Sequence, residues 1–286
     1  MKLLTCGIMV KNEEERIVRT ISSIIDHIDQ LVILDTGSTD TTIPKIEEFC
    51  KDKKVPLKIF KEEFVDFSHN RNHLLKHCYD LSEFVLLLDA NDEVKEPQLL
   101  VKYLQNKQIR NNKKLIFFRC KHDWINVENI AGNTCVYYRV SVIRNNRPEI
   151  HYKMPIHEFL TCDDPQPWKL DLNLENTGFY IFQDRSQDKS STDRIKKDIL
   201  VLTKYMAEHG EDPRNLRYMC QSFDCLKRYS ELFECSQKLV AYDDKKNPKK
   251  YVEDIYLGYL WKARSAFMTG HPDFNRFYLD AYKYSS

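Results

Sequence analysis

Short apolar runs alternate with helical stripes over the first 94 residues of the chain. Four runs are largely apolar and too short for helices, which predicts strands at 3–10, 31–35, 56–60 and 84–89. The polar and apolar spacing between these runs predicts amphipathic helices at 12–28, about 40–50 and 68–78. Strands and helices that alternate in this way predict right-handed βαβ units and a mostly parallel sheet.

The pattern changes after Asn111. Aromatic and β-branched runs without long helices between them predict an antiparallel extension of the sheet at 114–120, 135–144 and 177–182. We expect irregular loops around 121–133 and 144–173. From about Thr192 the pattern is helical, with one stripe formed by Leu216, Met219, Phe223 and Leu226. We therefore predict two domains, residues 1–190 and 191–286, with their boundary in the polar stretch QDRSQDKSST.

Composition narrows the functional classes. The 286 residues are 42% hydrophobic and 30% charged with a net charge of +1, so no general attraction to nucleic acid or to an anionic membrane is expected. The nine cysteines include no Cys-x-x-Cys pair, which disfavours zinc sites and disulfide frameworks and favours a reducing, cytoplasmic location. The apolar start lacks a small-residue cleavage site, so we predict a strand there and no signal peptide. No segment approaches the ~20 apolar residues of a membrane span.

Acidic side chains follow two of the predicted strands. Asp35 ends the second strand, and the stretch VLLLDANDEV places Asp89, Asn91 and Asp92 where the fourth strand ends. Ligands of parallel α/β sheets bind at the carboxyl ends of the strands, so we expect Asp35 and Asp89 to belong to one site. The alternative is a solvated turn, which Asp and Asn also favour.

Four motifs stand in the order MVKNEEERI, VILDTGSTDTT, FSHNRNHLL and LLLDANDEV, followed by RVSVIRNNRPEIHYKMPIHEFL. Together they resemble glycosyltransferase family 2, whose GT-A-fold enzymes use nucleotide-diphospho-sugars. The helical C-terminal part is similar to the tetratricopeptide-like tail of one branch of that family. The resemblance implies an α/β fold with a GT-A-type, Rossmann-like, mostly parallel central sheet, an antiparallel extension and an all-helical tetratricopeptide-like tail.

The resemblance also implies a site for the sugar donor. Asp35 would accept hydrogen bonds from uracil or ribose, Gly37 would permit a tight turn, and the planar guanidinium of Arg71 would suit a diphosphate. The alternatives are an ordinary strand-to-helix turn for Asp35 and a surface position for Arg71. The full implied donor set is Val10, Asn12, Glu14, Asp35, Gly37, Asp40, Arg71, Asp89, Ala90 and Asn91.

A divalent metal, Mn²⁺ or Mg²⁺, is the implied cofactor because hard cations prefer oxygen ligands. Its implied ligands are Asp89, Asn91, Asp92 and His157. The chain departs from the family pattern at Asn91, where the second aspartate usually stands. This departure leaves three alternatives. Either Asp92 takes over coordination of the metal, or Asn91 serves as a weaker ligand, or the dependence on a metal has been lost.

For catalysis, Glu158 is the candidate base that deprotonates the acceptor hydroxyl in an inverting displacement, and Asp123 is its rival. A structural loop pair is the alternative for His157 and Glu158. His69, His73 and His77 share one face of a predicted helix, and we expect them to be solvated or half-buried and not to bind zinc.

The leading hypothesis is therefore a hexosyltransferase-like enzyme that transfers a sugar from a nucleotide-sugar donor to an acceptor glycan or protein. The resemblance implies that the donor is a UDP-sugar. One alternative is a catalytically decayed binding or adaptor protein whose helical tail recruits a protein partner. Another is a sugar nucleotidyltransferase, although the chain lacks the glycine-rich N-terminal loop that holds a triphosphate. The sequence does not specify the sugar or the acceptor.

Overall fold

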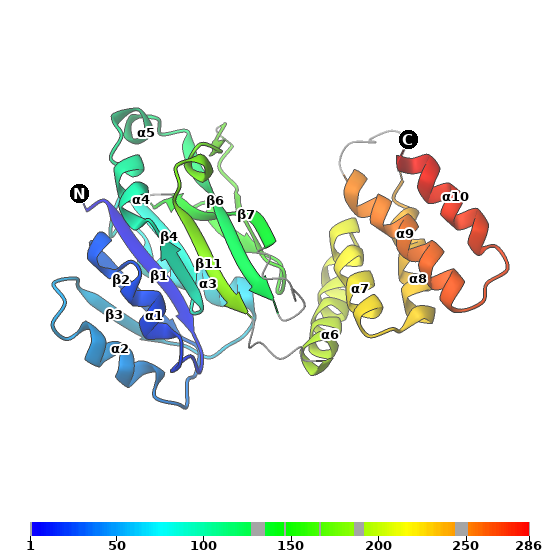
Figure 1. Cartoon of the computed structure of the whole chain (residues 1–286), viewed down its shortest axis with the longest axis horizontal. Coiled ribbons are helices and arrows are strands. Elements are labelled where there is room, and N and C mark those ends of the chain that lie inside the picture. Colours follow the sequence, from blue (N-terminus) through cyan, green and yellow to red (C-terminus); the bar gives the residue numbers. More distant parts are fainter. Residues whose placement is uncertain are drawn as a thin grey trace. The chain divides into compact units, whose positions relative to one another are not determined.

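The structure is a computed structural model that describes residues 2–126, 135–145, 147–165, 167–185, 192–243 and 251–285. The chain divides into two compact units, Met1–Lys189 and Ser190–Ser286. Each unit has its own architecture, a mixed α/β sheet in the first and helices in the second (Figure 1).

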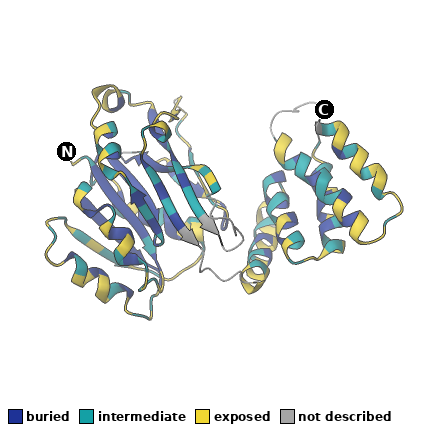
Figure 2. Ribbon diagram, viewed as in Figure 1, coloured by how far each residue is buried: buried dark blue, intermediate teal, exposed yellow. Residues whose placement is uncertain are grey.

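The central sheet of the first unit has the strand order β3-β2-β1-β4-β7-β6-β11-β5. Its parallel part consists of β1 (Leu4–Val10), β2 (Gln30–Asp35), β3 (Leu57–Lys61) and β4 (Phe84–Asp89). These strands confirm the four apolar runs of the sequence. Their residues are buried almost throughout in β1, β2 and β4, which appear dark blue in Figure 2.

The extension of the sheet is mixed and not antiparallel throughout. β7 (Cys135–Arg144) is antiparallel to β4 and to β6 (Leu115–Asn126), as predicted. By contrast, β11 (Tyr180–Arg185) runs parallel to β6 and antiparallel to β5 (Asp92–Lys95), and β10 (Lys169–Asp171) is parallel to β6. The acidic segment after β4 is thus itself a strand, which the sequence did not predict.

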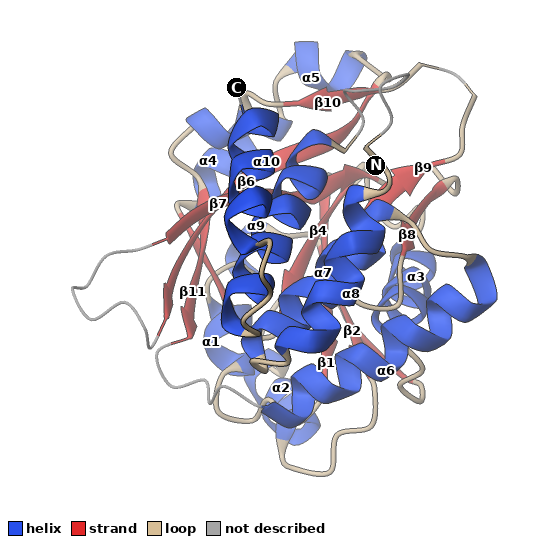
Figure 3. Ribbon diagram, turned by 90° about the vertical axis from the view of Figure 1, so that its right-hand side faces the viewer, coloured by secondary structure: helices blue, strands red, loops and turns tan. Residues whose placement is uncertain are grey.

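Two further strands contradict the irregular loop expected around 144–173. β8 (Ile150–Lys153) and β9 (Phe159–Cys162) form an antiparallel pair, and β8 contacts α3 (Figure 3). Strands of four residues offer too few positions for an alternation to be recognised. The loop expected around 121–133 is also wrong as far as Asn126, where β6 continues, and 127–134 lies outside the described residues.

Helices cover both faces of the sheet. They are α1 (Ile17–Ser22), α2 (Thr42–Cys50), α3 (Phe67–Cys78), α4 (Pro97–Leu104) and α5 (Lys107–Asn111), with 3₁₀ turns at Ile25–His27 and Leu174–Asn176. The helix predicted over 12–28 is much shorter. Backbone N–H groups of residues 12–14 donate to the loop after β2 and do not continue a helix, so the first helix begins only at Ile17.

The second unit consists of α6 (Thr192–His209), α7 (Pro213–Cys225), α8 (Tyr229–Val240), α9 (Val252–Met268) and α10 (Phe274–Ser285). Successive helices contact one another, as stacked helical pairs do. In the predicted stripe, Leu216 and Met219 are buried, whereas Phe223 and Leu226 are half-buried. A Cβ atom at Gly258 would lie 2.9 Å from Leu239 Cγ, so glycine permits the close approach of α9 to α8. Of the described helices, none is long and apolar enough to cross a membrane.

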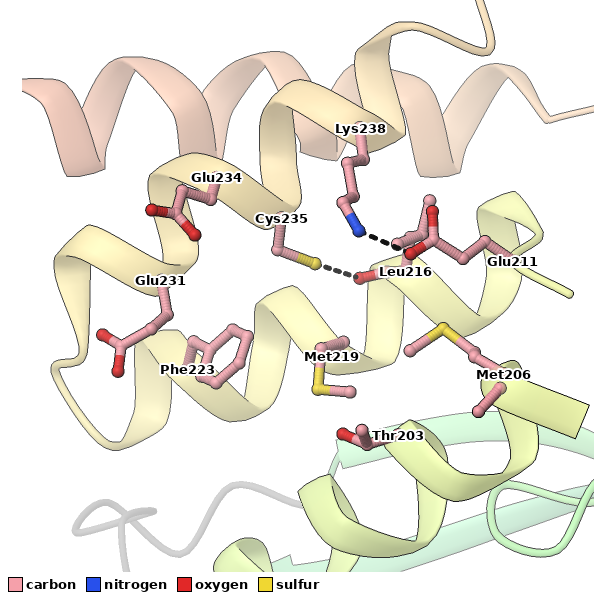
Figure 4. A pocket seen from close by; sticks show the side chains of 11 residues that line it. Thr203, Met206, Glu211, Leu216, Met219, Phe223, Glu231, Glu234, Cys235 and Lys238 are labelled. Carbon is pink, nitrogen blue, oxygen red and sulfur yellow. Dashed lines mark hydrogen bonds and ion pairs between the residues drawn. The ribbon is translucent and has the colours of Figure 1, made fainter.

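A pocket of about 380 Å³ opens between α6, α7 and α8 (Figure 4). Its apolar lining comes from Met206, Leu216, Met219 and Phe223. Its charged side chains are Glu211, Glu231, Glu234 and Lys238. Lys238 Nζ lies 2.6 Å from Glu211 Oε1, and Arg228 Nη2 lies 2.6 Å from Glu231 Oε1, so these two carboxylates each have a cationic partner.

Candidate active site

Asp89 lies at the carboxyl end of β4 between two guanidinium groups. Arg71 Nη2, from α3, donates to Asp89 Oδ1 at 2.6 Å, and Arg139 Nη1, from β7, donates to Oδ2 at 3.0 Å. Burial raises the pKa of Asp89, but the charges of Arg139 and Arg71 outweigh it and hold the pKa well below its usual range. Asp89 is therefore an ionised carboxylate whose two oxygens are both held by cations.

Asp92 is the first residue of β5 and is completely buried. Its Oδ2 accepts from the Asp89 N–H at 2.8 Å and from Arg139 Nη2 at 3.2 Å, and its Oδ1 accepts from Gln183 Nε2 of β11. Burial, and next the charge of Asp89, raise the pKa of Asp92 to about 6. The acidic stretch after β4 is thus an internal polar network and not a solvated turn.

Arg139 connects the two acids with a buried histidine. Its Nε lies 3.3 Å from His122 Nε2 and 3.3 Å from Ser141 Oγ, while its two terminal nitrogens reach Asp89 and Asp92. Burial would lower the pKa of Arg139, yet the charges of Asp89 and Asp92 raise it above the ordinary value. Arg139 is a permanent cation at the centre of the site.

Glu158 completes the cluster from the segment between β8 and β9. Arg71 Nε donates to Glu158 Oε1 at 2.6 Å, and the Arg71 guanidinium lies over the buried ring of Tyr152, 5.6 Å from its centroid. His157 beside it is exposed and has a φ of 54°, in the left-handed region. The predicted residues Arg71, Asp89 and Glu158 are therefore brought together.

Asp123, the rival base, is not brought to this cluster. On β6 it is adjacent to His122, whose side chain reaches Ser141 and Arg139, and neighbouring residues of a strand point to opposite faces. Asp123 instead pairs with Lys121 on its own face, with Nζ 3.0 Å from Oδ2. The structure therefore leaves Glu158 as the candidate base.

The predicted donor residues after β1 and β2 hold two loops together. Asn12 Oδ1 accepts from the Thr39 N–H at 2.8 Å, Glu14 Oε2 accepts from the Thr41 N–H at 3.1 Å, and the Glu14 N–H donates to Asp40 at 3.3 Å. These loops line a cavity of about 270 Å³ whose lining is mostly acidic, and such a lining does not suit a phosphate. Asn12, Glu14 and Asp40 thus have structural bonds in this region.

The remaining donor residues lie at strand ends. Asp35 is buried and its Oδ1 accepts from the Ser38 N–H at 2.9 Å, across a turn in which Gly37 has a φ of 100°. The carbonyl oxygens of Val10 and Ala90 accept hydrogen bonds from Thr36 and Thr20. Asn91 is half-exposed between Asp89 and Asp92.

The predicted metal ligands do not fit a divalent cation as they are placed. Among the described residues, no three His, Cys, Asp or Glu side chains are grouped so that they could hold a metal ion, so His157 does not join Asp89 and Asp92 in such a group. The oxygens of Asp89 and Asp92 are already engaged by the arginines, Gln183 and a backbone N–H. The oxygens that a hard cation would need as ligands already accept hydrogen bonds from cationic and neutral N–H groups.

The histidines of α3 have a carboxylate partner that sequence spacing did not reveal. Glu62 lies just after β3 and is hydrogen-bonded to both rings. Its Oε2 lies 2.6 Å from His73 Nδ1, and its Oε1 lies 2.9 Å from His77 Nε2. His77 also stacks on Phe60, with ring centroids 3.6 Å apart. His73 and His77 are half-buried, as expected, and their partner is a carboxylate.

Three residues of the cluster were missed by sequence reasoning: Arg139, His122 and Gln183. Arg139 lies within the predicted strand 135–144, whereas His122 falls in the loop expected around 121–133 and Gln183 follows the run 177–182. Their partners in the cluster lie on other strands, which local patterns do not reveal. A charged residue within an aromatic strand such as VYYRVSVIR is the one signal that could have pointed to Arg139.

His122 makes the stability of the first unit sensitive to acid. Burial, followed by the charge of Arg139, lowers the pKa of His122 to about 2. Between this value and the ordinary pKa of ~6.5, the unfolded chain binds a proton that the folded chain does not, so stability falls as the pH decreases, by at most ~1.4 kcal/mol per pH unit. Urea unfolding between pH 7 and pH 4 should show a smaller slope for His122→Gln. The exposed His209→Gln is the control, and equal slopes for His122→Gln and wild type would contradict this assignment.

Comparison with known proteins finds a family match within the first unit. The sequence profile described as "Glycosyl transferase family 2" matches residues 5–122. A TPR repeat-containing protein of Synechococcus elongatus is 26% identical over 231 residues, which is 77% of this chain and 51% of the relative. The SPbeta prophage-derived glycosyltransferase SunS of Bacillus subtilis is 34% identical over 89 residues, which is 31% of this chain and 20% of the relative. The chain thus spans about half of the first relative and a fifth of the second.

Among solved structures, the mannosyltransferase PcManGT of Pyrobaculum calidifontis, in complex with GDP-Man and Mn²⁺, covers 99% of this chain and 84% of its own. The identity is 13% and the TM-score 0.47, values at which the likeness carries no argument about this site. The family match and the curled, mostly parallel sheet agree with the predicted GT-A-type α/β fold followed by a helical tail. Residues 5–122, within the first unit, therefore match glycosyltransferase family 2.

Proposed function

We propose that the chain transfers a sugar from a nucleotide-diphospho-sugar, preferably UDP-linked, to an acceptor hydroxyl with inversion at the anomeric carbon. One observation carries this proposal. Arg71 links Glu158 to Asp89 at the carboxyl end of β4, within a family 2 domain. The Glu158 carboxylate and two guanidinium groups thus lie within one hydrogen-bonded cluster, at the edge where parallel α/β sheets generally bind ligands.

The proposed reaction is a direct displacement. The acceptor oxygen forms a bond to the anomeric carbon while the bond from that carbon to the diphosphate oxygen breaks, and the nucleoside diphosphate leaves with the electron pair. Glu158 takes the proton of the acceptor hydroxyl. Its Oε1 is held by Arg71, which fixes the carboxylate and leaves Oε2 outside this ion pair. The guanidinium groups favour the negative charge that grows on the leaving diphosphate.

Donor binding tests this proposal. Asp35 lies buried at the end of β2, where a carboxylate can accept hydrogen bonds from a uracil or ribose. Asp35→Ala is expected to weaken UDP binding by ~1–3 kcal/mol, the range for a hydrogen bond to a charged group. Calorimetry with UDP, GDP, CDP and ADP measures both affinity and selectivity.

The matched control is Asp26→Ala, because Asp26 is an exposed acid of the same domain. Unchanged UDP affinity in Asp35→Ala would remove Asp35 from the donor site. If wild type bound none of the four nucleotides, the transferase proposal itself would fail and the adaptor alternative would gain support.

The tail pocket favours a second candidate function, the binding of a protein segment. An apolar floor that contains two methionines adapts to different side chains. Three carboxylates lie around it against the two cations Lys238 and Arg228, and this excess of negative charge favours a basic partner. We propose that this pocket takes an apolar side chain flanked by Lys or Arg, on a partner protein or on a protein acceptor.

Charge reversal tests the tail pocket. The double variant Glu231→Lys and Glu234→Lys is expected to weaken binding of a fluorescent peptide of alternating Leu and Arg by ~5-fold or more. The new lysines repel the arginines of the peptide, which mainly slows its association with the pocket. Anisotropy at low and physiological salt measures it. Glu253→Lys, on the exposed start of α9, is the control. Equal peptide binding by the double variant and the control would exclude the pocket as the site.

A further inference from the structure

Arg139 occupies the place between the two acids that a divalent cation would take in a site of bare carboxylates. It reaches Asp89 Oδ2 at 3.0 Å and Asp92 Oδ2 at 3.2 Å, one terminal nitrogen for each acid. Arg71 holds the other oxygen of Asp89. Two permanent cations thus hold the two acids at the carboxyl end of β4, and Arg71 also holds Glu158.

We infer that this chain binds the diphosphate of its donor through Arg139 and Arg71 and that this binding needs no divalent cation. The inference rests on the proposed function, because it concerns the same donor. It also accounts for asparagine at position 91, because a site that needs no metal needs no second aspartate to hold one.

The hydrogen-bonding capacity of the arginines permits this role. Each terminal nitrogen of a guanidinium carries two hydrogens, and the bonds from Arg139 to Asp89 and Asp92 use one on each nitrogen. Arg71 contacts Asp89 and Glu158 through Nη2 and Nε, so Nη1 takes no part in these two bonds. Both arginines contact the same carboxylate, which keeps their remaining N–H groups close enough for the oxygens of one diphosphate. Guanidinium groups bind such oxygens in pairs.

The burial of Asp92 argues against a cation in the same place. Its side chain has no exposed surface, and its oxygens accept from Gln183, Arg139 and the Asp89 N–H. A cation that took these oxygens would displace Arg139 and leave a partly buried guanidinium without its partners, which is unfavourable. Both oxygens of Asp92 have hydrogen-bond partners in this network without a cation.

UDP affinity with and without metal tests the inference. Calorimetry of the full chain in EDTA and in Mn²⁺ should give UDP affinities that agree within ~3-fold, because the cations that hold the diphosphate are part of the protein. Arg139→Gln should lower UDP affinity in EDTA by ~10–100-fold, the loss expected for a hydrogen bond to a charged group. Arg139→Lys, which keeps the charge but not the fork, should fall between the two.

Metal rescue separates a diphosphate-binding role from a merely structural one. In Arg139→Gln, oxygens of Asp89 and Asp92 become accessible to a cation, so Mn²⁺ should restore part of the lost UDP affinity although it has no effect on wild type. Arg119→Gln is the matched control, since Arg119 is on β6, pairs with Glu175 and lies on the other face of the sheet. Its UDP affinity should be unchanged.

Three results would overturn the inference. The first is a wild type that binds UDP only with Mn²⁺, and the second is an Arg139→Gln variant that binds UDP normally in EDTA. The third is a loss of UDP affinity in Arg139→Gln that Mn²⁺ does not reduce, although the variant melts at the same temperature as wild type. A wild type that binds UDP in Mn²⁺ alone would leave the proposed transferase function intact. A wild type that binds no nucleotide in either condition would remove that function, and this inference with it.

Discussion

Glu158→Gln is expected to lower the rate of sugar transfer by ~10²–10⁴-fold, the range for removing a general base. Glutamine has nearly the same shape and can still accept the hydrogen bond from Arg71 Nε, but it cannot take the proton of the acceptor hydroxyl. The affinity for UDP should change little, because the variant alters the acceptor side of the reaction. Initial rates of nucleoside-diphosphate release, with UDP affinity measured in parallel, check both parts.

The control for this prediction is Asp123→Asn. Asp123 is also a strand carboxylate paired with a cation, but its side chain lies on the face of β6 opposite to that of His122. Its activity should remain near that of wild type. If Asp123→Asn lost activity and Glu158→Gln kept it, the roles of the two acids would have to be exchanged.

Asp89→Ala should destabilise the first unit by ~3–5 kcal/mol, the cost of removing one partner from a buried ion pair. Arg71 and Arg139 both lose a hydrogen-bonded carboxylate, while Arg71 stays buried and Arg139 partly buried. Urea unfolding at pH 7 measures the change in the free energy of unfolding. Glu93→Ala is the control, because Glu93 is the next acid but one of the same stretch and pairs with Lys95 near the surface.

The pH dependence of the same variant gives an independent check. The pKa of Asp89 is lower in the folded chain than in the unfolded one. Its contribution to stability is therefore complete above the unfolded pKa of ~3.9 and is lost as the pH falls below it. The difference between wild type and Asp89→Ala should shrink between pH 5 and pH 2, and a constant difference would contradict the ion-pair assignment.

The sequence was informative where burial is local and continuous. The run FVLLLD is β4, which is almost wholly buried, and the run CVYYRVSVIR is β7, which is buried in its second half, each with the predicted bounds. Continuous apolar runs and β-branched or aromatic runs of this length favour strands. The first four strands are parallel, as predicted, so Asp35 and Asp89 both lie at the carboxyl edge of the sheet. Asp89 could be placed at that edge before its partners were known.

The sequence was uninformative where a residue owes its position to a distant segment. The four residues of β5, DEVK, look like a solvated acidic turn, and they form a strand only because β11 pairs with them about ninety positions later. The partners of Asp92, Arg139 and Gln183, are likewise far away in sequence. A pattern of neighbouring residues cannot report which cation neutralises a buried acid.

The loops after β1 and β2 show a second limit. Their polar residues match the motifs of nucleotide-sugar enzymes, and the same oxygens hold the two loops together. Motif spacing alone does not distinguish a side chain that contacts a ligand from one that shapes the loop around it. Asp35, Arg71, Asp89 and Glu158 are the motif residues on which the proposed chemistry depends.

The most direct test of this chemistry is the fate of a nucleotide-sugar in the presence of the purified chain. We expect UDP-glucose, UDP-N-acetylglucosamine or another UDP-sugar with an α-linkage to be cleaved slowly to UDP and a sugar, with water in place of the acceptor. Proton NMR at early times should show the β-anomer of the released sugar, as direct inversion requires, and Glu158→Gln should release almost none. Release of the α-anomer, or equal release by wild type and Glu158→Gln, would contradict the proposed mechanism.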